Sequence, residues 1–187
     1  MRKQKGFSLI ELLIVVAIIL IIAAIAIPNL LRSRIAANDS AAASTIRTMN
    51  TGEVTYLTTY PQHGYAEQLI FLGPGAAPGV DCSVPANVTQ TSACLIDSVL
   101  GCSANGPCPK SGYNYFITSA TAAAPFADYT VSAGPISWGS SGSANWCSNP
   151  DAVIRSTRGL AAPPAASIAA PVSLANCAAP ANYKASQ

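Results

Sequence analysis

Six cysteines carry the most obvious chemistry of this chain, because cysteines can form disulfides, bind a metal ion or remain free thiols. They are Cys82, Cys94, Cys102, Cys108, Cys147 and Cys177. Many pairings are possible, and the sequence alone does not choose among them. Cys102 and Cys108 lie close together in a loop with glycine and proline, so a local bridge is reasonable. No C-x-x-C pair occurs, so a metal site is a weaker alternative, and free thiols are a third.

The other polar side chains form no catalytic pattern. The single histidine, His63, lies in a Pro/Gly turn where a surface position is expected, and no second histidine could activate a serine. The sequence contains no G-x-S-x-G, no phosphate-binding glycine motif and no haem-attachment motif. The carboxylates form neither a close pair nor a calcium loop. We therefore expect no enzymatic activity, no cofactor and no metal ion.

An apolar segment near the N-terminus decides where these side chains are located. Residues 7–27 carry one charge, Glu11, and as a helix they would be about 31 Å long, close to the thickness of a bilayer's hydrocarbon core. The segment is too long for the apolar part of a secretory signal, and no small-residue cleavage site follows it. Basic residues precede it at positions 2–5, so the positive-inside rule places the N-terminus in the cytoplasm. The cysteines would then lie on an oxidising side, which favours disulfides.

The stretch KGFSLIELLIVVAII, residues 5–19, resembles the leader and N-terminal helix of type IV prepilins. It combines a basic leader, a glycine, a phenylalanine and an acid at the fifth position after the cut, and the resemblance continues to Ile35. It implies that a prepilin peptidase cleaves between Gly6 and Phe7 and then N-methylates Phe7. The alternative is an uncleaved single-pass membrane anchor.

Glu11 needs an explanation in such a segment. An acid in hydrocarbon costs up to about 3 kcal/mol, and less near the end of the span, so an interfacial charge without a role is one interpretation. After cleavage, Phe7 would carry a free amine one helical turn away, at the positive end of the helix dipole. The resemblance implies that the amine of an incoming subunit neutralises the carboxylate of a docked neighbour. Phe7 and Glu11 are therefore the candidate assembly residues.

Pro28 either ends this helix or kinks a longer one, because proline removes a hydrogen bond and clashes with the carbonyl of Ala24. Apolar residues at helical spacing beyond it favour the kink. They are Ile35, Ala42, Ile46, Met49, Val54 and Leu57, whereas Arg34, Asn38, Asp39 and Arg47 are expected on the surface. Residues 7–58 would then form a helix about 77 Å long. Residues 7–27 would lie in the membrane or filament core, and residues 28–58 would pack on a globular head.

Strand signals begin at Tyr113. Residues 113–118 and 128–133 predict one hairpin, and residues 144–147 and 151–156 predict a second, in which Arg155 is a solvated strand residue. Residues 59–112 are predicted to be a connecting loop, with a short helix at 94–100. Residues 161–187 contain 11 alanines and 4 prolines among 27, which predicts a loop or partly disordered tail that Cys177 could pin.

We therefore predict an α+β protein with the pilin fold that the resemblance implies. One long helix would pack on an antiparallel sheet of about four strands (113–157), within a loop-rich, disulfide-bonded head (59–160). The resemblance also favours a bridge from Cys147 to Cys177, which would leave Cys82 to pair with Cys94.

Loss of the leader, residues 1–6, would leave seven basic and eight acidic residues, a net charge of −1. No basic patch remains, so nucleic acid would bind only through an assembled filament. The resemblance implies an inner-membrane precursor that the pilus machinery assembles into an extracellular homo-oligomeric filament for adhesion, motility or DNA uptake. One alternative is a periplasmic pseudopilin of a type II secretion system, although major pseudopilins usually lack disulfides. Another is a membrane-anchored extracytoplasmic binding module that stays monomeric.

Overall fold

The fold was obtained as a computed structural model, which describes residues 7–75, 80–102, 107–158, 168, 170 and 172–186. The chain divides into two units, Met1–Arg34 and Ile35–Gln187, and the boundary falls inside helix α1 (Leu9–Thr59). α1 continues through Pro28 and ends directly before Tyr60 and Pro61. The prediction of one long helix, rather than a helix that ends at the proline, is therefore confirmed.

Within the second unit, α1 presents one face to the rest of the head. The buried positions at its centre recur in steps of three and four residues, at Asp39, Ala42, Ile46, Met49, Glu53 and Tyr56. Steps of this size keep side chains on one side of a helix. The prediction was right for Ala42, Ile46 and Met49 but wrong for Val54, which is 49% exposed. Two acids, Asp39 and Glu53, lie on this buried face among the apolar residues.

Within the part of the chain that the structure describes, the sheet has six antiparallel strands in sequence order. They are β1 (Cys108–Lys110), β2 (Tyr113–Thr118), β3 (Thr130–Pro135), β4 (Trp146–Ser148), β5 (Arg155–Ser156) and β6 (Lys184–Ala185). The four central strands overlap the predicted ranges, although β5 covers only the last two residues of the strand predicted at 151–156. The two edge strands were not expected. β1 was assigned to the connecting loop. It pairs with β2 through Ser111 and Gly112, whose φ angles of 49° and 77° suit a two-residue hairpin turn.

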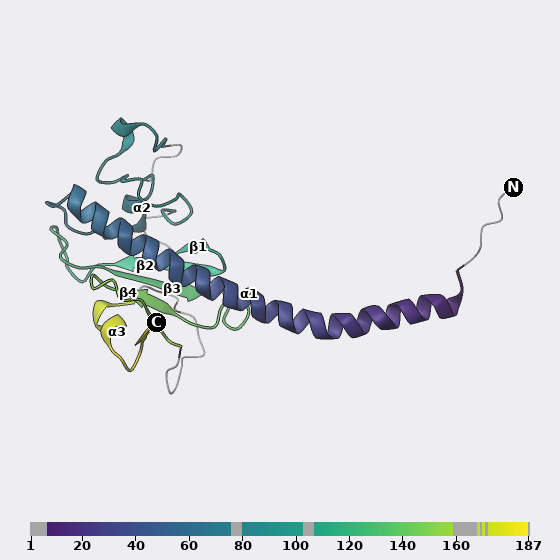
Figure 1. The fold of residues 1–187 in the computed structure, drawn as a ribbon. Coiled ribbons are helices and arrows are strands. Elements are labelled where there is room, and N and C mark those ends of the chain that lie inside the picture. The colour runs from purple at the N-terminus through teal and green to yellow at the C-terminus, as the bar shows by residue number, and fades with distance from the viewer. Residues whose placement is uncertain are drawn as a thin grey trace. The chain divides into compact units, whose positions relative to one another are not determined.

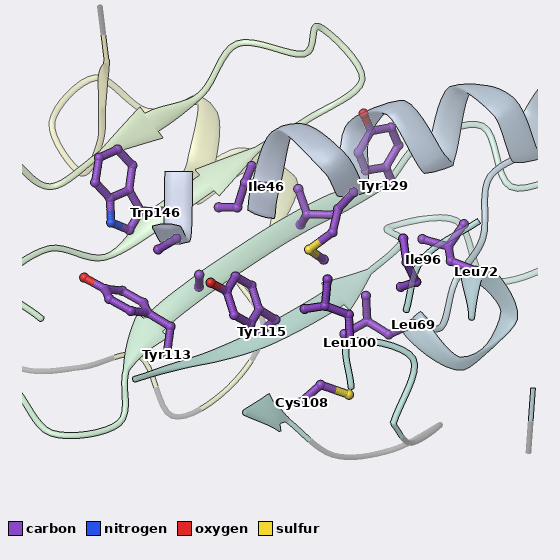
Figure 2. Close-up of a cluster of buried hydrophobic side chains, with 14 of the residues drawn as sticks. Ile46, Leu69, Leu72, Ile96, Leu100, Cys108, Tyr113, Tyr115, Tyr129 and Trp146 are labelled. Atoms are coloured by element: carbon purple, nitrogen blue, oxygen red, sulfur yellow. The ribbon is translucent and has the colours of Figure 1, made fainter. Parts of the chain in front are cut away.

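Both faces of the sheet are covered. The second half of α1 lies across one face (Figure 1), and Figure 2 shows Ile46 with Tyr113, Tyr115 and Trp146 in the cluster between them. Successive strand residues point to opposite faces. Cys147, which follows Trp146, therefore belongs to a separate cluster with Val172, Cys177 and Tyr183.

The C-terminal segment forms this second cover and is more ordered than predicted. Residues 172–186 contain helix α3 (Leu174–Ala178) and strand β6, so the expectation of a loop or disordered tail is wrong for this part. Ser173 caps α3 by accepting a hydrogen bond from the Asn176 N–H. The Val172 N–H donates to the Ser132 hydroxyl on β3. Residues 159–167, where the predicted head and tail meet, lie outside the described residues.

The six cysteines form three disulfides, so the expectation of a disulfide-bonded head is confirmed. The bridges join Cys82 to Cys94, Cys102 to Cys108, and Cys147 to Cys177. The first two close short loops around the connecting region. The third ties α3 to β4, 30 residues apart in the sequence.

We expect replacement of Cys147 and Cys177 by serine to lower the free energy of unfolding by about 3 to 4 kcal/mol, because this bridge closes the longest of the three loops. Replacement of Cys102 and Cys108, which are 6 residues apart, should cost about 2 kcal/mol. Denaturant titration of the full-length protein in detergent, followed by tryptophan fluorescence, measures both. A smaller loss for the Cys147–Cys177 pair would contradict the structural role given to the C-terminal cover.

The connecting region differs from the prediction in its helices. Residues 94–100 are not helical, because Leu95 and Ile96 both donate backbone hydrogen bonds to the Leu72 carbonyl and Cys94 has a φ of 55°. Helix α2 (Leu69–Leu72) lies earlier in the chain, and a 3₁₀ turn, η1, spans Pro85–Asn87.

Candidate assembly site

The start of α1 carries the predicted assembly residues. The helix begins at Leu9, and the Leu12 N–H donates to the Ser8 carbonyl at 3.2 Å. Glu11 lies in the first turn, where a negative charge interacts favourably with the helix dipole. Phe7 is 73% exposed and lies two residues before the first residue of the helix. Gly6, the other half of the predicted cleavage site, lies outside the described residues.

The surface of the first unit is apolar, and its exposure to water is unfavourable. Its large apolar side chains from Leu9 to Leu31 are exposed on all sides of the helix. This part of α1 reaches a mean hydropathy of 3.3 and is long enough to cross a membrane. Among the residues that the structure describes, no basic side chain forms an ion pair with Glu11. A helix that is apolar all round needs lipid or other helices around it, and a lone acid on it needs a cation.

Pro28 lies inside α1, four residues after Ala24, so the backbone hydrogen bond to the Ala24 carbonyl is missing. The kink at this position stays a prediction.

A buried carboxylate, Asp39, fastens α1 to the head. It is fully buried, whereas the sequence predicted a surface position. Its oxygens accept hydrogen bonds from the Tyr113 hydroxyl, from the Ser143 N–H at 3.1 Å and from the Ser143 hydroxyl at 2.8 Å. Arg158 completes the network with an ion pair and also lies over the Trp146 ring, 5.6 Å from its centroid. Burial, together with the hydrogen bond to Asp39, raises the pKa of Tyr113.

Two further polar residues of α1 face the head. The Asn50 amide donates to the Ser148 hydroxyl at 2.9 Å, and its carbonyl oxygen accepts from the Tyr129 hydroxyl at 3.2 Å. Glu53 is fully buried and accepts the Ala66 N–H at 2.9 Å. Sequence reasoning missed both. The signal that could have found them is the spacing from Ile46 and Met49, which continues through Asn50 and Glu53 regardless of polarity.

His63 and Arg155 are more enclosed than predicted. The His63 side chain is only 13% exposed: Nε2 lies 2.9 Å from a Glu67 oxygen, and the ring packs against Phe126. Arg155 forms an ion pair with Asp151 and donates to the Val153 carbonyl, so it is not simply solvated. The hydrogen bonds from Arg155 lower the pKa of Asp151. Within the described ranges, no cluster of three His, Cys, Asp or Glu side chains is placed to hold a metal ion.

Comparisons with known proteins agree with this arrangement. Residues 1–27 match a family model described as the prokaryotic N-terminal methylation motif. The chain is 38% identical over 115 residues to the type IV wide pilus major component PilA4 of Thermus thermophilus, a match that covers 61% of this chain and 77% of that protein. It is 41% identical over 56 residues to the type IV major pilin protein PilA of Myxococcus xanthus, which covers 30% of this chain and 26% of that one. No solved structure matches.

Fold and helix surface together define an α+β protein in which one long, partly apolar N-terminal helix carries a small antiparallel sheet. The relatives and the methylation motif place this arrangement in a family: the chain belongs to the type IV pilins. The predicted pilin fold is confirmed.

Proposed function

We propose that this chain is a shaft subunit of a type IV pilus, assembled through the apolar half of α1. The observation that carries the proposal is the exposed apolar surface of that half, interrupted only by Glu11. The fully exposed segment must leave lipid for an equally apolar setting, and a bundle of identical helices supplies one. The names of the two relatives, a major component of a type IV pilus and a major pilin, support the same conclusion.

In this proposal the precursor is anchored in the inner membrane with its leader in the cytoplasm. Prepilin peptidase cleaves between Gly6 and Phe7 and methylates the new amine, in line with the methylation motif at residues 1–27. The amine of an incoming subunit then pairs with Glu11 of a subunit already in the filament. Adhesion, motility or DNA uptake would come from the filament and its machinery.

Two measurements test the proposal. Mass spectrometry of the protein from sheared surface material should find a mature N-terminus at Phe7 that carries one methyl group. Electron microscopy with an antibody to the head should label filaments along their length outside the cell. Label confined to the periplasm would favour a secretion pseudopilin, and monomers that retain Met1 would indicate an uncleaved anchor.

A further inference from the structure

Glu53 is a buried acid in α1 that takes no part in the proposed filament assembly. Its side chain lies in the last two turns of α1 and is fully excluded from water. One carboxyl oxygen, Oε2, accepts the Ala66 N–H, and the other, Oε1, has no hydrogen-bond partner among the described residues. An unpartnered carboxylate oxygen in such a place is costly, whereas a protonated carboxyl is much less so.

Among the residues that the structure describes, no cation pairs with Glu53. The titratable groups that interact with Glu53 are Tyr56 on α1, Glu67 on the following segment and Tyr129 beside β3. Glu67 is itself paired with His63. Desolvation, with a smaller contribution from Glu67, raises the pKa of Glu53 to about 8, although the Ala66 hydrogen bond acts in the opposite direction.

Ala66, the hydrogen-bond donor to Glu53, belongs to residues 60–67, which we call the cover segment. Backbone hydrogen bonds join it to Phe126: the Tyr65 N–H donates to the Phe126 carbonyl at 2.9 Å, and the Phe126 N–H donates to the His63 carbonyl at 2.7 Å. Its side chains add further contacts, because the Tyr65 ring lies 4.8 Å from the Tyr129 ring and Ala66 is buried in the main core cluster. Gly64 passes so close to Phe126 that a Cβ would lie 2.2 Å from the Phe126 carbonyl oxygen. Among the described residues, the backbone hydrogen bonds of the cover segment go to α1, to the segment itself and to Phe126, and none goes to a strand, so opening the segment would break no strand pairing.

We propose that Glu53 is a proton-operated latch, which holds the cover segment against α1 while its carboxyl is protonated and loosens it on ionisation. Because Glu53 is fully buried, its ionisation favours a form in which the cover segment moves away from α1 and water reaches the carboxylate. The folded head binds a proton at Glu53 that the open form releases more easily, so the closed form loses stability as the pH rises from about 4.5 towards 8. At lower pH both forms are protonated, and the closed form is at its most stable.

Amide hydrogen exchange of the full-length protein in detergent tests the latch. After correction for the intrinsic pH dependence of exchange, protection of the amides of Tyr65, Ala66 and Phe126 should fall by roughly 10- to 100-fold between pH 6 and pH 9, the range that the pKa of about 8 implies. Amides of β2, such as that of Tyr115, serve as an internal control and should keep their protection.

Two variants separate the latch from general loosening. Glu53→Gln keeps the shape and removes the titration, so protection of the cover segment should no longer depend on pH. Glu67→Gln removes the neighbouring charge but keeps the latch, so its pH dependence should persist. Equal protection of the wild-type segment at pH 6 and pH 9 would overturn the proposal, whatever the variants do. A wild-type pH dependence retained in Glu53→Gln would also overturn it.

Discussion

Glu11→Ala is expected to abolish filaments while leaving the subunit cleaved and inserted in the membrane. An ion pair between Glu11 and a neighbour's terminal amine would lie in apolar surroundings, where loss of one partner leaves the other charge unpaired. Such a loss costs at least about 3 kcal/mol, which lowers each docking equilibrium constant by about 100-fold or more. The measurements are the mass of the processed subunit in membranes and the amount of protein in sheared surface filaments.

Ser8→Ala is the matched control, because it removes a polar group from the same end of α1 without changing the charge. It should be processed and assembled like the wild type. Normal filaments from Glu11→Ala would refute the pairing, whereas loss of cleavage in that variant would assign Glu11 to recognition by the peptidase instead.

Asp39→Ala should lower the free energy of unfolding of the head by about 3 to 4 kcal/mol. The change leaves the Ser143 N–H without its acceptor and removes the anchor of Arg158, while it opens a small cavity beneath α1. Tyr113 keeps a second partner, the Ala144 carbonyl at 3.0 Å, so the loss is not larger still. Denaturant titration of the full-length protein, followed by tryptophan fluorescence, measures the change.

Arg158→Ala provides the comparison. Its side chain is 49% exposed, so water can replace its charge beside Asp39, and we expect a loss of about 1 kcal/mol. A smaller effect of Asp39→Ala than of Arg158→Ala would show that the ion pair, rather than the hydrogen bonds of the buried carboxylate, holds α1 to the head.

Features that depend on local pattern were predictable from the sequence. The apolar run and its single acid identified the first half of α1, because a membrane or filament helix must be apolar over its whole length. Residues 113–118 predicted β2 with its observed bounds, since its aromatic and β-branched residues suit a half-buried strand. The edge strands escaped prediction, because two or three residues such as Lys184 and Ala185 carry no detectable alternation.

The sequence by itself determined the family, the long helix and the central strands of this protein, because each rests on residues that are neighbours along the chain. Only the tertiary structure decided that Asp39 and Glu53 are interior residues and that the alanine-rich C-terminal segment covers a face of the sheet. The donors that make an acid tolerable in the core come from far away: Ser143 lies 104 residues after Asp39. The polarity of such acids predicts a surface position. The folded structure can bury them because it supplies hydrogen bonds that replace those made with water.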